Sequence, residues 1–176
     1  MSTARTLADG VPVLRQDIGL GESPPPACHP RIARLLDYWQ AQSPGPGLLP
    51  GRQHIDPLRI PDLLTHLWML DVVPEDPRRY RVRLMGGAVV EAGAQMRKGD
   101  FFTDRVSPSE AEQSMAVFRR IETSRRVDWK RGPSALQHME HVYALERAMM
   151  PMASDGTTVD LLLCISVFYW KDGRVY

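Results

Sequence analysis

Histidine and cysteine are the residues of this sequence that could hold a metal ion, but their spacing does not predict a site. The chain contains 5 His and 2 Cys. Its closest histidine pair is His138 and His141, and this spacing places both rings on one face of a helix but on opposite faces of a strand. A metal site also needs further ligands at a compatible spacing. Because the sequence offers none, we expect no metal.

Nucleophilic chemistry is not predicted either. Cys164 lies among leucine and isoleucine residues, whereas a reactive thiol needs a positive and partly exposed setting. The chain lacks the Gly-x-Ser-x-Gly sequence of a nucleophile elbow, and the pair Gly86 and Gly87 lacks the pattern of a phosphate-binding loop. We therefore predict no catalytic residue and no enzyme activity. An unrecognised small-molecule enzyme is the least favoured alternative.

Basic residues gather in two segments, 78–83 and 119–131, without predicting nucleic-acid binding. The whole chain has 22 Lys and Arg against 21 Asp and Glu, which leaves a formal net charge of +1. Nucleic-acid-binding domains combine a basic face with a recognition helix or with aromatic stacking residues. Neither motif accompanies these arginines, so we interpret both segments as solvated faces and expect no nucleic-acid partner.

Length and hydropathy favour one soluble domain. A chain of 176 residues suits a single core, and two cysteines exclude a disulfide framework. The N-terminal residues lack the apolar core of a secretory signal, and the most apolar run, residues 159–170, is too short to cross a bilayer. We therefore expect a cytoplasmic protein that does not bind membranes.

Proline and glycine mark the boundaries of the expected elements. Residues 1–27 show no periodicity and end in three prolines, so we predict a flexible arm followed by one domain over residues 28–176. A helix is predicted over about residues 30–42, because the following apolar residues recur at helical spacing: Ile32, Leu35, Leu36 and Trp39. Ser107 to Glu110 form a capping box that should open a second helix ending near Ser124.

Strands are expected from alternating or continuous apolar patterns. Residues 138–152 are ambiguous, because their composition favours helix while Asp155 and Gly156 favour a hairpin turn into the next strand. We predict a strand there. The other predicted strands are residues 66–73, 79–85, 127–130 and 159–170.

The order of these elements resembles the PAS fold, and particular residues resemble a bacterial PAS-like subfamily. They are Leu35, Leu36, Tyr38 and Trp39, then Leu49 to Arg52, Ile55 to Pro57, Ile60, Pro61, Leu63, Leu64, Asp71, Arg83, Leu84, Gly86, Gly93 and Gly99. Gly87 departs from the pattern, since the subfamily often has threonine there. The resemblance implies an α+β fold with a five-stranded antiparallel sheet and short helices over one face. It also implies a sensory domain, commonly dimeric.

The resemblance also implies where a ligand would bind. Short helices near Gly86, Gly93 and Gly99 would cover a cavity above the sheet, with core filling as the alternative for each lining residue. The expected lining residues are Met85, Val89, Val90, Met96, Phe101, Phe118 and the inner face of residues 161–167. Arg52 and Arg83 belong to the resembling motif and could contact a ligand or form structural ion pairs, as Arg52 could with Asp56. The reactive cysteine motif and the haem-type histidine of other PAS domains are absent, so no cofactor is expected.

The strand at residues 159–170 is apolar on both faces, so both faces must be covered. We predict that the helix at residues 30–42 covers the second face and, through its apolar stripe, helps to form a homodimer. The predicted function is a non-catalytic sensory module for signal transduction. It would bind a small molecule or a partner signalling protein and act in trans. The alternative is an interaction or dimerisation scaffold without a ligand.

Overall fold

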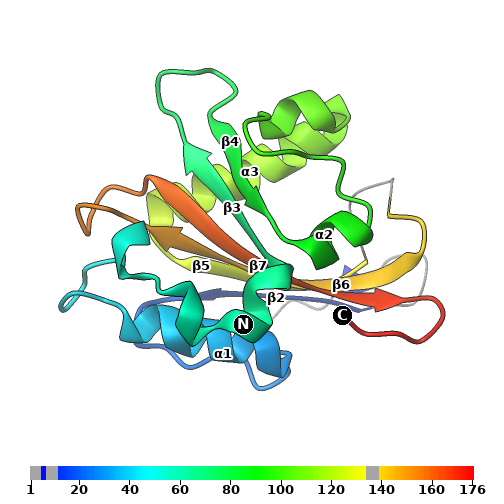
Figure 1. Cartoon of the computed structure of the whole chain (residues 1–176), viewed down its shortest axis with the longest axis horizontal. Helices are drawn as coiled ribbons and strands as arrows, with labels where there is room; N and C mark the ends of the chain where they lie inside the picture. Colours follow the sequence, from blue (N-terminus) through cyan, green and yellow to red (C-terminus); the bar gives the residue numbers. More distant parts are fainter. Residues whose placement is uncertain (1–4, 7–11, 134–138) are drawn as a thin grey trace.

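A computed structural model describes residues 5–6, 12–133 and 139–176. One antiparallel sheet of seven strands runs through the molecule in the order β1-β2-β5-β6-β7-β3-β4 (Figure 1). The strands are β1 (Arg5–Thr6), β2 (Pro12–Ile18), β3 (Leu67–Val72), β4 (Tyr80–Met85), β5 (Val127–Gly132), β6 (Val142–Met152) and β7 (Leu161–Trp170). The helices are α1 (Pro30–Ala41), α2 (Gly87–Glu91) and α3 (Pro108–Ser124), with 3-10 turns η1 (Arg52–His54), η2 (Pro57–Arg59), η3 (Pro61–His66) and η4 (Phe102–Arg105).

The sheet is wider than the five strands predicted. Strands β1 and β2 come from residues 1–27, which the sequence placed in a flexible arm, and β2 pairs with β5 from Leu14 opposite Arg131 to Ile18 opposite Val127. The three prolines on which the arm was predicted follow β2, so they do not predict the conformation of that strand. Pairing with β2 also covers an edge of β5 that would otherwise expose its backbone hydrogen-bonding groups.

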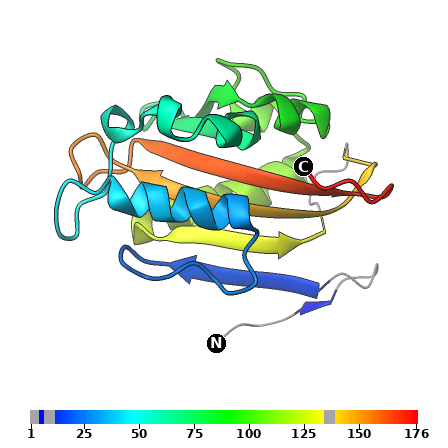
Figure 2. The same ribbon diagram turned by 60° about the horizontal axis from the view of Figure 1, so that its bottom comes forward.

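Helix α1 packs on one side of the sheet against β6 and β7, while α2 and α3 lie on the other side (Figures 1 and 2). Its apolar stripe is completely buried within the single chain: Ile32, Leu35, Leu36 and Trp39. The Trp39 Nε1 atom donates a hydrogen bond of 3.2 Å to the carbonyl oxygen of Pro151 in β6. The stripe is therefore not available to a second subunit, which corrects the predicted basis for a homodimer.

Helix α3 is fixed at both ends and at its centre. The predicted capping box is present, with the Ser107 backbone N–H donating to Glu110 Oε2 at 2.8 Å. At the other end Arg125 adopts a left-handed conformation and its guanidinium donates to the carbonyl oxygens of Gly47 and Gly156. In between, the Phe118 ring packs edge-on against Tyr80 and Phe102, each with centroids 5.0 Å apart.

Most of the ambiguous segment forms the predicted strand, from Val142 to Met152, whereas residues 139–141 lie outside it in a turn. Strand β6 pairs with β7 over most of its length and with β5 from Leu145 to Met149, so it lies in the interior of the sheet with a partner on each side. His138 lies outside the described residues, so the predicted His138 and His141 geometry is not described. Next to β6, Cys164 of β7 is completely buried, and the loss of solvation raises the pKa of its thiol.

Candidate ligand-binding site

A pocket of about 420 Å³ lies between the sheet and helices α2 and α3. Such a volume falls within the roughly 300–1,000 Å³ typical of small-molecule sites. Most of its lining is apolar and comes from strands β3, β4, β6 and β7, from α2 and α3, and from the loops beside them. The apolar lining residues are Trp68, Met85, Val89, Ala94, Met96, Phe102, Ala116, Val117, Phe118, Met139, Leu145, Met149 and Phe168.

Four of the predicted ligand-binding residues line this pocket: Met85, Val89, Met96 and Phe118. Met85 reaches it because of an irregularity in the pairing of β3 and β4, where Met69 lies opposite Leu84 but Leu70 lies opposite Val82. The shift changes the alternation of β4, so that Leu84 is 41% exposed.

Two other predicted lining residues lie elsewhere. Val90 is 49% exposed, on the outer side of α2. Phe101 is replaced in the pocket by its neighbour Phe102, because the η4 turn begins at Phe102 and directs that ring inward. The Phe101 ring instead lies under the guanidinium of Arg78, 3.9 Å from ring centroid to carbon.

Arg52 and Arg83 do not reach the main pocket. They line a separate, more polar hollow of about 290 Å³ together with Asp71. Arg83 Nε pairs with Asp71 Oδ1 at 2.5 Å, which favours the structural interpretation of this residue. Arg52 Nη1 donates to the carbonyl oxygen of Ile55 at 2.9 Å, in place of the expected ion pair with Asp56.

A row of polar residues crosses the floor of the main pocket, and sequence reasoning missed it. Arg15 of β2 lies opposite Lys130 of β5, Lys130 opposite Arg147 of β6, and Arg147 opposite Ser166 of β7. All four line the pocket, and we call them the polar row. Only the strand register brings them together, because each comes from a different strand. The pocket's other polar lining residues, Gln113 and Ser114, come from α3.

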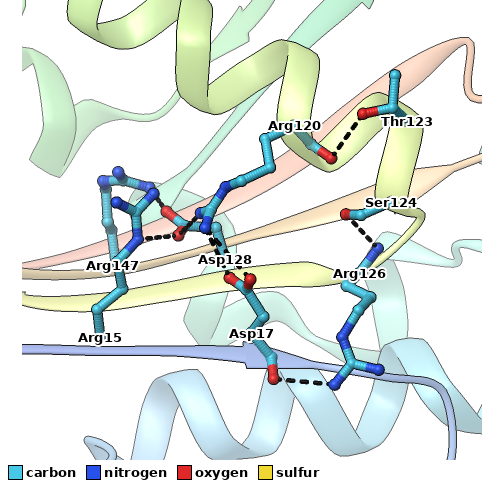
Figure 3. A network of polar contacts seen from close by, with 8 residues as sticks. All are labelled: Arg15, Asp17, Arg120, Thr123, Ser124, Arg126, Asp128 and Arg147. Atoms are coloured by element: carbon cyan, nitrogen blue, oxygen red, sulfur yellow. Dashed lines mark hydrogen bonds and ion pairs between the residues drawn. The ribbon is translucent and has the colours of Figure 1, made fainter. Parts of the chain in front are cut away.

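Asp128 is the carboxylate closest to this row. Its side chain is 1% exposed, and Arg15, Arg120 and Arg147 converge on it (Figure 3). Arg15 Nε lies 2.7 Å from Oδ1 and Arg147 Nη1 lies 2.9 Å from Oδ2. Burial opposes ionisation of Asp128, but the neighbouring guanidiniums of Arg147 and Arg15 outweigh it and lower its pKa.

At Lys130, in contrast to Asp128, the surroundings disfavour the charged form of the side chain. Burial is the main cause that lowers the pKa of its ammonium group, and the positive charges of Arg147 and Arg15 lower it further. Asp128 only partly opposes these effects. Lys130 takes part in none of the ion pairs formed by the described residues.

A second buried carboxylate, Glu146, lies on the opposite side of the sheet. It accepts hydrogen bonds from the backbone N–H of His29 at 2.7 Å, from Trp129 Nε1 at 2.9 Å and from the Tyr169 hydroxyl at 3.0 Å. Since His29 is the N-cap of α1, Glu146 holds the start of that helix. Glu146 and Arg147 are consecutive in β6, so one strand connects the pocket to α1.

The comparison with family models agrees with this architecture. Residues 27–166 match the model PAS_5, described as a PAS domain. The chain belongs to the PAS domain family. Its central strands and the pocket over them lie largely within the matched part, although β1 and β2 precede it. Among curated proteins and solved structures, none matches the chain significantly.

Neither a metal centre nor a membrane span is found in the part of the PAS domain that the structure describes. No group of three or more His, Cys, Asp or Glu side chains in these residues is placed to hold a metal ion. None of the helices they form is long and apolar enough to cross a membrane. Membership of the family indicates a sensory or regulatory role.

Proposed function

We propose that this PAS domain is a non-catalytic sensor whose small-molecule ligand occupies the pocket between the sheet and α2 and α3. The observation that carries the proposal is the pocket itself, of about 420 Å³ and lined mainly by apolar side chains. Four of its lining residues are methionines, whose flexible side chains adapt to ligands of irregular shape: Met85, Met96, Met139 and Met149.

Strand β6 provides a route for the signal. A ligand that contacts Arg147 acts on the strand that also carries Glu146, and Glu146 holds the N-terminus of α1 through His29. A ligand shifts an equilibrium between two arrangements only by the difference in its affinity for them. We propose that the bound and free states differ in how firmly α1 is held, and that a separate signalling protein recognises the difference.

We also propose that the domain forms a homodimer, but through a surface other than the apolar stripe of α1. Because the apolar stripe of α1 is buried in the chain, a homodimer would use the outer surface of α1 or another face. The outer positions of α1 include Arg34 and Asp37, which are exposed and charged. A dimer of this kind would be more polar than one built on the stripe.

Native mass spectrometry of the protein purified from its own host, followed by denaturing extraction, tests both the bound ligand and the homodimer. We expect a stoichiometric small molecule, released on unfolding. Val117→Trp should abolish its binding, because Val117 lines the pocket from α3 and the indole would fill the space. Glu112→Trp is the matched control, since Glu112 lies on the same helix but is exposed and outside the pocket.

A ligand-free protein that also fails to bind small molecules added in a screen would contradict the sensor proposal. In that case the scaffold alternative would be favoured. A small molecule that stays bound to folded Val117→Trp would place its site outside the pocket. The mass of the intact particle reports separately whether the domain is a dimer.

A further inference from the structure

The polar row divides the pocket into a charged floor and an apolar surround. Along β6, the side chains that line the pocket beside this row are apolar: Met149 lies one step from Arg147 on the same face, and Leu145 lies one step in the other direction. Asp128, opposite Met149 in β5, is not part of the pocket lining. Phe168 lies opposite Leu145 in β7 and also lines the pocket. A ligand that fills the pocket would therefore meet cations at one place and hydrocarbon around them.

The charges at this floor are not balanced within the described residues. Four cations lie together there: Arg15, Arg120, Lys130 and Arg147. They face two carboxylates, Asp128 and Asp17, so a surplus of two positive charges remains. Like charges directly opposite each other on neighbouring strands are destabilising, and both the Arg15–Lys130 and the Lys130–Arg147 pairs are of this kind.

Hydrogen-bond donors are also available at the same place. Ser166 Oγ accepts a hydrogen bond from Trp68 Nε1 at 3.0 Å, which leaves its own hydroxyl hydrogen free to be donated. The Lys130 ammonium carries three donors and joins no ion pair among the described residues. Lys130 and Ser166 flank Arg147 on the neighbouring strands, so an anionic group over Arg147 would lie between these two donors, and its charge would raise the pKa of Lys130 again.

We infer that the ligand of this pocket is an amphipathic organic anion, a monocarboxylate with a medium-length apolar body, whose carboxylate binds at Lys130, Arg147 and Ser166. This inference rests on the proposed function and names its ligand class. One carboxylate offsets part of the surplus charge and suits a floor whose polar groups lie in a single row. The apolar body lies against Met149, Phe168 and the residues of α2 and α3.

Decanoate and 1-decanol are matched probes, because they share the same chain and differ in the charge of the headgroup. Isothermal titration calorimetry on the full chain, stripped of any copurified molecule, measures both affinities. We expect decanoate to bind at least tenfold more tightly than 1-decanol, as a charge-assisted hydrogen bond in a partly buried site provides about this preference.

Variants of Lys130 test the headgroup site. Lys130→Met should lower the affinity for decanoate about tenfold and leave that for 1-decanol within about threefold, since only the charge is removed. Lys130→Arg should keep the preference for decanoate. Lys171→Met is the control, because Lys171 is exposed and outside the pocket. Circular dichroism melting confirms that each variant is folded.

The outcomes separate this inference from the proposed function. Equal binding of both probes, blocked by Val117→Trp, would keep the pocket as a ligand site and overturn the anion preference. Binding of neither probe would overturn this inference, and the host-purified protein with its Val117→Trp variant would decide the proposed function by itself. An equal loss of both probes in Lys130→Met would overturn the assignment of the headgroup to Lys130.

Discussion

The two faces of the central sheet each bury one carboxylate, and they satisfy it in different ways. On the α1 side, Glu146 accepts hydrogen bonds from a backbone N–H, an indole and a phenol, with Arg131 Nε 3.9 Å away. On the pocket side, Asp128 is surrounded by three arginines, and Lys130 lies in the adjacent row. The first arrangement has its hydrogen bonds complete, whereas the second has more cations than the described carboxylates neutralise.

This difference separates a structural cluster from a binding cluster. Removing a partner from a complete hydrogen-bond cluster leaves buried donors unsatisfied and only costs stability. Removing a cation from an unbalanced cluster relieves repulsion and costs affinity for an anion instead. Changes on the α1 side should therefore alter stability alone, whereas on the pocket side stability and affinity for an anion should change in opposite directions.

The largest effect is expected at Glu146. Glu146→Leu leaves the His29 N–H, Trp129 Nε1 and Tyr169 hydroxyl without their acceptor. We expect a loss of about 3 kcal/mol or more in the free energy of unfolding, measured by urea denaturation. Hydrogen exchange should show faster exchange in α1 than in α3. Unchanged exchange in α1 would show that Glu146 does not hold this helix.

Asp128→Asn should have the second-largest effect. Four cations would then share one remaining carboxylate, and we expect a loss of about 2 kcal/mol in the free energy of unfolding. Added decanoate should raise the melting temperature of this variant more than that of Glu146→Leu, because the loss of the Asp128 charge increases the surplus of positive charge at the pocket floor. Equal rescue of both variants would remove the distinction between the two clusters.

Acid should act on the same carboxylate. Because the folded state lowers the pKa of Asp128, its contribution to stability is complete above the unfolded value of about 3.9 and is lost as the pH falls below it. The wild type should therefore lose more stability than Asp128→Asn between pH 5 and pH 2 in urea titrations. Parallel losses in the two proteins would show that Asp128 carries no pH-dependent stability.

The smallest change in the free energy of unfolding is expected for a substitution of Lys130, and here the protein should become more stable. Since its folded pKa is lowered, the charged form of Lys130 is disfavoured by folding at neutral pH. Lys130→Met should raise the free energy of unfolding by about 0.5 kcal/mol through loss of like-charge contacts across the strands. Lys171→Met, at an exposed position, should leave it unchanged. A destabilised Lys130→Met would mean that Lys130 has a structural role.

Local signals predicted the elements that depend on few neighbours. The Ser107 and Glu110 capping box and the helix it opens are confirmed. The capping box depends on residues within one turn of the chain. Four of the six individually predicted lining residues also line the pocket, since the family resemblance placed them there: Met85, Val89, Met96 and Phe118.

The failures share a different origin. Strand β2 shows little alternation of burial and exists because β5 pairs with it. The order of inward-facing residues in β4 changes at an irregularity in pairing, and the choice between Phe101 and Phe102 depends on where the η4 turn begins. Arg52 and Arg83 were carried over from a motif, but their side chains belong to another surface.

By itself, the sequence determined where the chain turns, which segments are apolar and to which family the domain belongs. Only the tertiary structure decided which side chains share the pocket floor. Arg15, Lys130, Arg147 and Ser166 carry no common spacing, and three of them were interpreted as an arm, a solvated face and an ambiguous segment. Strand register arises from the pairing of distant segments, so the charge of this floor becomes visible only when the sheet is assembled.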